Sequence, residues 1–129
     1  ARFGALFVGN RTMEAVLKEI IFDHTLVTAA VLDRSNRNRQ REDMITPLMS
    51  LRDSLPLWEQ HFAPRLKEIR HPTLILWGEQ DRLFPPQVGR DLQTTTPQAR
   101  LIMIPEAGHI PQWEQPQVVN RHITEFLQP

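Results

Sequence analysis

The sequence predicts an α/β protein whose second half contains a parallel sheet, and three observations support this prediction. Residues 1–70 show only the apolar spacing that is typical of helices. After Pro72, two short uninterrupted apolar runs appear, and a segment with helical spacing follows each of them. Strands that alternate with helices in this order need crossover connections, so the two strands are expected to lie parallel.

The first part of the chain is predicted to be entirely helical. Thr12 is a suitable N-cap for a helix whose apolar side chains recur on one face: Met13, Val16, Leu17, Ile20 and Ile21. A second helix is expected to begin at Thr28 and to run into a polar, arginine-rich segment. Pro47 and Pro56 are expected to bracket a third helix, because proline disrupts a helix interior. Helix-like spacing then continues over residues 58–70.

The second part is predicted to alternate between strands and helices. Residues 72–77 form the first apolar run, and such a continuous run is typical of a strand that is buried on both faces. A second strand is predicted over residues 100–104. The prolines Pro85, Pro86 and Pro116 open the helices that follow the two strands. The last helix is expected to turn four apolar side chains toward the core: Val119, Ile123, Phe126 and Leu127.

The composition indicates a globular domain and excludes several classes of function. Lysine and arginine together number 15, as do aspartate and glutamate, so no net field favours nucleic acid or an anionic membrane. We therefore expect a small-molecule substrate, no nucleic-acid partner and no membrane partner. The chain has no cysteine, which excludes disulfides and a cysteine nucleophile from it. No apolar stretch is long enough to span a membrane, so a soluble, cytoplasmic protein is expected.

Two residues are candidates for acid–base chemistry because of their places beside the predicted strands. Asp81 follows the end of the first strand, and His109 follows the end of the second. In a parallel sheet the carboxyl ends of the strands share one edge, where ligands bind and catalytic loops gather. A buried carboxylate bonded to Nδ1–H of a histidine fixes the tautomer in which Nε2 can accept a proton.

Each candidate also has a structural interpretation. Aspartate after a Gly-x-x spacing often stabilises a turn, and a histidine after a glycine often just ends a strand. The combination of Asp81 and His109 is rarer, because an acid and a histidine must follow successive strands with one helix and one strand between them. The other histidines show no metal-ligand spacing, so we expect no metal and no other cofactor.

Residues 72–85 and 108–116 resemble the acid and histidine segments of the α/β-hydrolase superfamily. The resemblance implies that the chain is the C-terminal portion of an α/β-hydrolase fold, with Asp81 as the triad acid and His109 as the triad base. It also implies that residues 1–70 form a helical cap or lid and that residues 71–129 form the C-terminal part of the core.

Within the superfamily, two segments are similar to the meta-cleavage-product hydrolases, which split carbon–carbon bonds of ring-fission products. These segments are residues 22–28 and 112–114. An esterase-like activity is an equally open alternative.

The nucleophile of such a triad is not expected in this chain. The superfamily carries it in a Gly-x-Ser-x-Gly turn, and none of the serines, Ser35, Ser50 and Ser54, has glycines at that spacing. The expectation is that this turn would precede Ala1. A serine there would serve ester or carbon–carbon hydrolysis, whereas an aspartate would serve epoxide or haloalkane hydrolysis.

A second hypothesis is a non-catalytic fragment that survives by self-association. Two apolar strands alone form a marginal sheet, and an open strand edge attracts another chain. The expected partner is therefore either the N-terminal half of the hydrolase fold or a second copy of this chain.

Overall fold

The computed structural model describes residues 12–40 and 42–128, so residues 1–11 of the predicted cap lie outside the described part. Helix α2 (Met13–Ile20) begins at Thr12, whose side chain accepts a hydrogen bond from the backbone N–H of Ala15 at 3.3 Å. Its buried side chains fall on one face, as the apolar spacing predicts: Val16, Leu17 and Ile20. The first predicted helix is confirmed.

The second predicted helix is also confirmed. A short 3₁₀ helix, η1 (His24–Leu26), leads into α3 (Ala29–Arg39). The Thr28 hydroxyl caps α3 by accepting from the N–H of Val31 at 3.3 Å. The N-caps of both helices thus follow from their local sequence.

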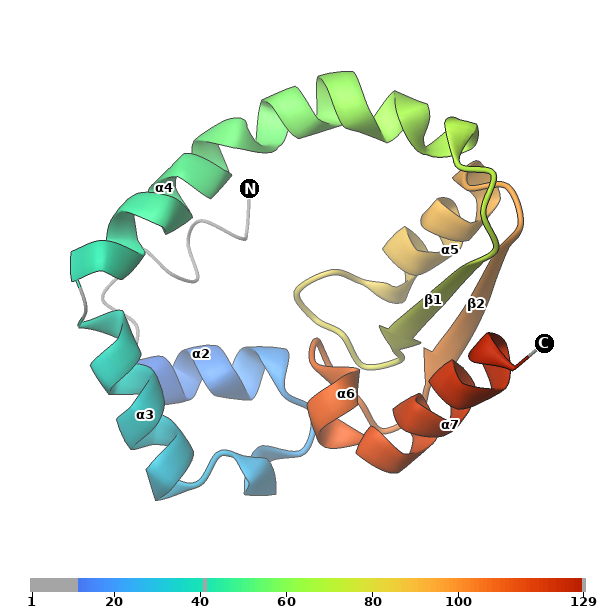
Figure 1. The fold of residues 1–129 in the computed structure, drawn as a ribbon. Helices are drawn as coiled ribbons and strands as arrows, with labels where there is room; N and C mark the ends of the chain where they lie inside the picture. The colour runs from blue at the N-terminus through green and yellow to red at the C-terminus, as the bar shows by residue number, and fades with distance from the viewer. Residues whose placement is uncertain (1–11, 41, 129) are drawn as a thin grey trace.

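The prediction that prolines bracket a third helix is wrong. Helix α4 (Glu42–Leu57) runs through both Pro47 and Pro56. A proline inside a helix removes one N–H donor, but the hydrogen bonds of the neighbouring turns can carry the helix past it. The chain continues as a π-helical stretch, η2 (Trp58–Phe62), and then as the 3₁₀ stretch η3 (Ala63–Glu68). Figure 1 shows this stretch as a green arc between α3 and the sheet.

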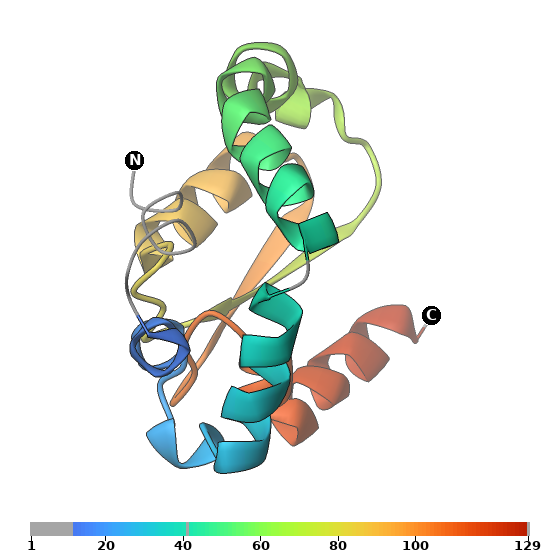
Figure 2. The same ribbon diagram turned by 90° about the vertical axis from the view of Figure 1, so that its left-hand side faces the viewer.

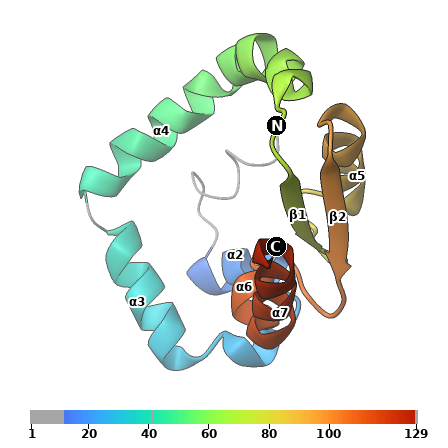
Figure 3. The ribbon, with the colours of Figure 1, turned by 45° about the vertical axis from the view of Figure 1, so that its right-hand side comes forward.

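The sheet has the predicted order and direction. Strand β1 (Thr73–Gly78) pairs in parallel with β2 (Ala99–Ile104), and the register joins the first residues of the two strands and likewise the last. Helix α5 (Pro86–Thr95) forms the crossover and packs against both strands. After β2 the chain makes a one-turn helix, α6 (Pro111–Glu114), and then α7 (Pro116–Leu127). Figure 3 shows the two strands side by side next to α5.

Burial in this part is lower than the sequence predicts. Residues 73–77 of β1 are half-buried rather than buried on both faces, because the described sheet has only two strands. In α7, Val119 is buried, but Ile123 is 39% and Leu127 is 72% exposed. The expected inner face of α7 is therefore correct for Val119 and in part for Phe126, which is half-buried, but not for Ile123 and Leu127. Figure 2 shows α7 (red) below and to one side of the strand pair.

Two apolar clusters form the core. One joins α2 to the loop that follows β1, because Leu83 packs among the buried side chains of the helix. The other lies beneath the end of β2 and consists of Ile104, Ala107 and Val119. The first cluster brings the helical part of the chain onto the loop of Asp81. Among residues 12–40 and 42–128, no helix is long and apolar enough to cross a membrane.

Candidate active site

Asp81 lies in a tight turn immediately after β1. Its carboxylate is nearly buried, with 4% of the side chain exposed. Oδ1 accepts hydrogen bonds from the backbone N–H groups of Leu83 and Phe84, both at 2.9 Å. An aspartate that binds the amides two and three residues later holds its own loop in place. The turn therefore fixes the direction of the other carboxylate oxygen.

His109 lies on the loop after β2, and backbone contacts join this loop to the loop of Asp81. The N–H of Gln80 donates to the carbonyl of Ala107 at 2.9 Å, and the side-chain oxygen of Gln80 accepts from the N–H of Ala107 at 3.0 Å. Glu106 turns the chain with a left-handed φ of 53°. These contacts hold the two loops together at the carboxyl edge of the strands.

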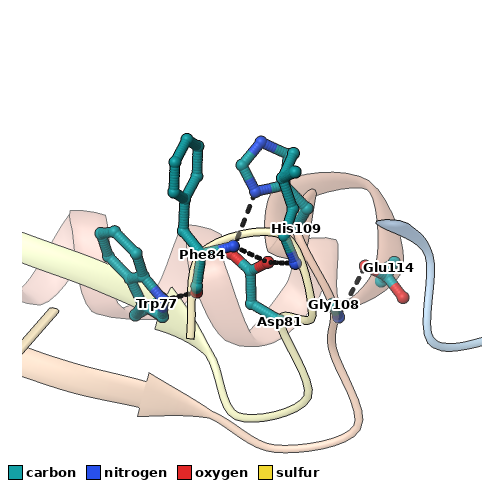
Figure 4. A network of polar contacts seen from close by, with 7 residues as sticks. Trp77, Asp81, Phe84, Gly108, His109 and Glu114 are labelled. Carbon is teal, nitrogen blue, oxygen red and sulfur yellow. Dashed lines mark hydrogen bonds and ion pairs between the residues drawn. The ribbon is translucent and has the colours of Figure 1, made fainter. Parts of the chain in front are cut away.

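The two predicted residues meet at this edge. Nδ1 of His109 lies 2.9 Å from Oδ2 of Asp81 (Figure 4). An ionised carboxylate can only accept, so this contact assigns the hydrogen to Nδ1, and in a neutral imidazole Nε2 is then the acceptor nitrogen. The imidazole is 30% exposed, whereas the carboxylate is almost covered. The histidine can thus reach a reacting group while its acid partner stays away from solvent.

Phe84 borders the imidazole on one side. Its ring centroid lies 5.4 Å from that of His109, with the planes tilted by 49°. The carbonyl of Phe84 accepts a hydrogen bond from the indole N–H of Trp77 at 3.0 Å. The loop that carries Asp81 is therefore anchored to the end of β1 as well.

Two glycines allow the loops to approach so closely. A Cβ atom at Gly78 would overlap the carbonyl oxygens of Ala107 and Gly108, and one at Gly108 would overlap the carbonyl of Ile20. Backbone atoms cannot move aside as a flexible side chain can, so these positions exclude a side chain.

Glu114 is a residue of the site that sequence reasoning missed. It is 9% exposed and accepts hydrogen bonds from the backbone N–H groups of Gly108, Phe22 and Asp23. From the sequence, Glu114 was named only within residues 112–114, as part of a resemblance. The one signal in the sequence was its position six residues after Gly108. Its contacts with Phe22 and Asp23, which lie 92 and 91 positions earlier in the chain, could not be predicted from the neighbouring sequence.

Within the described residues, no serine forms a hydrogen bond with His109. Ser54 donates to the carbonyl of Ser50 within α4 instead.

An open hollow of about 380 Å³ lies beside residues 22–25 and is also lined by Glu106 and Gln115. Neither Asp81 nor His109 lines it, so it is separate from the candidate active site. The hydroxyl and N–H of Thr25 hold the pKa of Asp23 in this hollow below its usual range.

A metal site is not formed in the described part of the chain. Residues 12–40 and 42–128 contain no group of three or more histidine, cysteine, aspartate or glutamate side chains placed to hold a metal ion. The candidate site is thus a carboxylate and an imidazole at the carboxyl edge of a parallel sheet. A covered carboxylate bonded to the Nδ1 of an accessible imidazole is the arrangement that acid–base chemistry uses in a catalytic triad.

The chain belongs to the α/β hydrolase fold family, which it matches over residues 9–116. It is 32% identical over 117 residues to 2-hydroxy-6-oxononadienedioate/2-hydroxy-6-oxononatrienedioate hydrolase from Comamonas testosteroni, and this match covers 90% of the chain and 41% of that protein. It is 34% identical over 118 residues to 2-hydroxy-6-oxo-6-phenylhexa-2,4-dienoate hydrolase from Delftia acidovorans, with the same coverage. The chain thus spans about two fifths of the length of these relatives.

Solved structures show the same fold. A meta-cleavage product hydrolase from Pseudomonas fluorescens IP01 superimposes with a TM-score of 0.79 at 21% identity, over 96% of this chain and 48% of that one. A putative lipase from Acinetobacter baumannii AYE superimposes with a TM-score of 0.78 at 26% identity, over 95% of this chain and 42% of that one. The predicted class, the C-terminal portion of an α/β-hydrolase fold, is confirmed.

Proposed function

We propose that this chain supplies the acid and the base of a nucleophile–histidine–acid triad, with Asp81 as the acid and His109 as the base. The observation that carries the proposal is the 2.9 Å contact between Nδ1 of His109 and Oδ2 of Asp81. The carboxylate is covered and already holds its own loop, so it can orient the imidazole without moving.

The separate roles of His109 and Asp81 follow from this contact. Nε2 of His109 takes the proton of the nucleophile as it attacks the substrate, and the buried carboxylate of Asp81 stabilises the imidazolium that forms. The same Nε2–H then returns the proton to the leaving group. The nucleophile and the oxyanion hole come from another part of the fold, outside this chain.

The substrate class that we propose is a small molecule with a hydrolysable carbon–carbon bond next to a carbonyl group. The relatives that share 32–34% identity with the chain are named as hydrolases of 2-hydroxy-6-oxo dienoate compounds. Hydrolysis of a carboxylic ester is the second candidate, and the 26% identical putative lipase supports it. Both reactions begin with attack on a carbonyl carbon, so the same acid–base pair serves either one.

The experiment that tests the proposal is His109→Ala in the complete assembly that contains the nucleophile. Turnover should be lost because the general base is removed, while the melting temperature should fall far less than for a core residue, because the ring is 30% exposed. The matched control is His71→Ala, an exposed histidine outside the site. Undiminished labelling of the His109→Ala protein by a fluorophosphonate, or loss of its fold, would show that His109 is structural.

A further inference from the structure

We propose that Glu114 is a positioning residue, whose buried carboxylate ties the cap segment at Phe22–Asp23 to the loop of His109 and thereby keeps the imidazole on Asp81. The inference rests on the role proposed above for His109. It adds a third side chain, which binds backbone N–H groups rather than the imidazole and therefore acts through the backbone.

The carboxylate of Glu114 divides its two oxygens between two distant segments. Oε1 accepts from the N–H of Gly108 at 2.8 Å. Oε2 accepts from the N–H of Phe22 at 2.6 Å and from that of Asp23 at 3.2 Å. One side chain thus joins a segment of the predicted cap to a loop of the predicted core, and Figure 4 shows the bond to Gly108.

A buried carboxylate needs such partners. Burial of a charge is costly unless hydrogen bonds or an opposite charge compensate for it. No lysine or arginine forms an ion pair with Glu114 in the described residues, so the three backbone N–H groups carry this compensation. Because those amides are fixed in two chain segments, the carboxylate holds the segments at one separation.

The link to the imidazole is short. Gly108 directly precedes His109, and the N–H of His109 donates to the carbonyl of Ile20 at 2.7 Å. Two consecutive amides of the histidine loop are therefore bound, one to Glu114 and one to the end of α2. If the bond to Glu114 is lost, Gly108 can rotate, and the direction of the His109 side chain relative to Asp81 changes with it.

Glutamine at position 114 provides a sharp test, since it keeps the size of the side chain. Its amide has one acceptor oxygen, which can accept from Gly108 or from the Phe22–Asp23 amides but not from both. Its NH₂ group would then point at the remaining N–H donor, to which it cannot form a hydrogen bond. Glu79→Gln is the matched control, because Glu79 is an exposed carboxylate near the same loops. Both variants are made in the complete assembly that contains the nucleophile.

Three measurements separate positioning from a general loss of stability. Hydrogen–deuterium exchange followed by mass spectrometry reports the amides of peptides that contain residues 20–24 and 106–110. The ring ¹⁵N signals of His109 report which nitrogen carries the proton. Steady-state kinetics report kcat and KM separately, and the melting temperature reports the fold.

We expect Glu114→Gln to speed exchange in at least one of the two peptides and to shift the ring ¹⁵N signals of His109 toward a mixture of tautomers. The value of kcat should fall on the order of 10- to 100-fold, as expected for a catalytic group displaced by a fraction of an ångström to 1 Å, with little change in KM. Glu79→Gln should change none of these quantities.

The proposal is overturned if the ring signals of His109 and kcat stay at their wild-type values while exchange increases, because the tether would then be structural only. It is also overturned if exchange at both peptides is unchanged. Absence of turnover in the wild type would count against the proposed function alone, and the ring signals would still decide the role of Glu114.

Discussion

One carboxylate oxygen of Asp81, Oδ2, lies 2.9 Å from Nδ1 of His109. The other, Oδ1, accepts hydrogen bonds from two backbone N–H groups of its own loop. The acid is thus bound on both sides before any substrate arrives. A group that is oriented in advance stabilises the developing charge without rearranging during the reaction.

Asp81→Asn should abolish most of the activity of the complete assembly while leaving the fold intact. The amide can present its NH₂ group to Nδ1, which favours the tautomer with the proton on Nε2 and removes the base. The equivalent change in a serine protease lowers kcat on the order of 10⁴-fold, and we expect a similar loss in steady-state kinetics. Asp91→Asn, on the exposed face of α5, is the control. A wild-type kcat in the Asp81→Asn protein would contradict the proposed role of the acid.

Gly78→Ala should destabilise the protein, because its Cβ would overlap the carbonyl oxygens of Ala107 and Gly108. Overpacking of this kind costs about 1–3 kcal/mol or more in the free energy of unfolding. Chemical denaturation measures this loss. Gln93→Ala, an exposed position of α5, should change the free energy by less than about 0.5 kcal/mol. Equal stability of the Gly78→Ala protein and the wild type would show that the two loops are not in close contact.

Ile104→Ala should be far more destabilising than Leu127→Ala, although the sequence places both residues in apolar segments. Ile104 has 0% of its surface exposed, so its truncation leaves a cavity and costs about 2–5 kcal/mol. Leu127 is 72% exposed and should cost less than about 0.5 kcal/mol. Thermal and urea unfolding of the two variants give the comparison. A large effect at Leu127 would instead indicate that another chain covers the end of α7.

The isolated 129-residue chain should self-associate and should not hydrolyse an ester. Residues 73–77 of β1 are only half-buried, and an apolar strand with an open edge attracts another strand. The triad as proposed lacks its nucleophile and oxyanion hole here, so nothing stabilises the charge that develops on the substrate. Size-exclusion chromatography with light scattering and a p-nitrophenyl ester assay measure both properties. A monomer that turns over the ester faster than free imidazole would refute this expectation.

The contact between Asp81 and His109 could be predicted from the sequence because it depends on local patterns. Two uninterrupted apolar runs with a helix between them determine two parallel strands, and parallel strands place their following loops at one edge. The N-caps at Thr12 and Thr28 were predictable for the same reason, since a cap needs only a hydroxyl and the next turn of helix.

Other features depend on residues that are far apart in the chain, and only the tertiary structure decided them. In the sequence, Glu114 is only a charged residue in a short polar segment. Its role depends on the N–H groups of Phe22 and Asp23, which lie more than 90 positions earlier in the chain. A pattern of side chains along the chain determines which elements form, because that choice rests on neighbours within a few residues. Which face of an element is covered, as at Val119 but not at Leu127, depends on what the rest of the fold places against it.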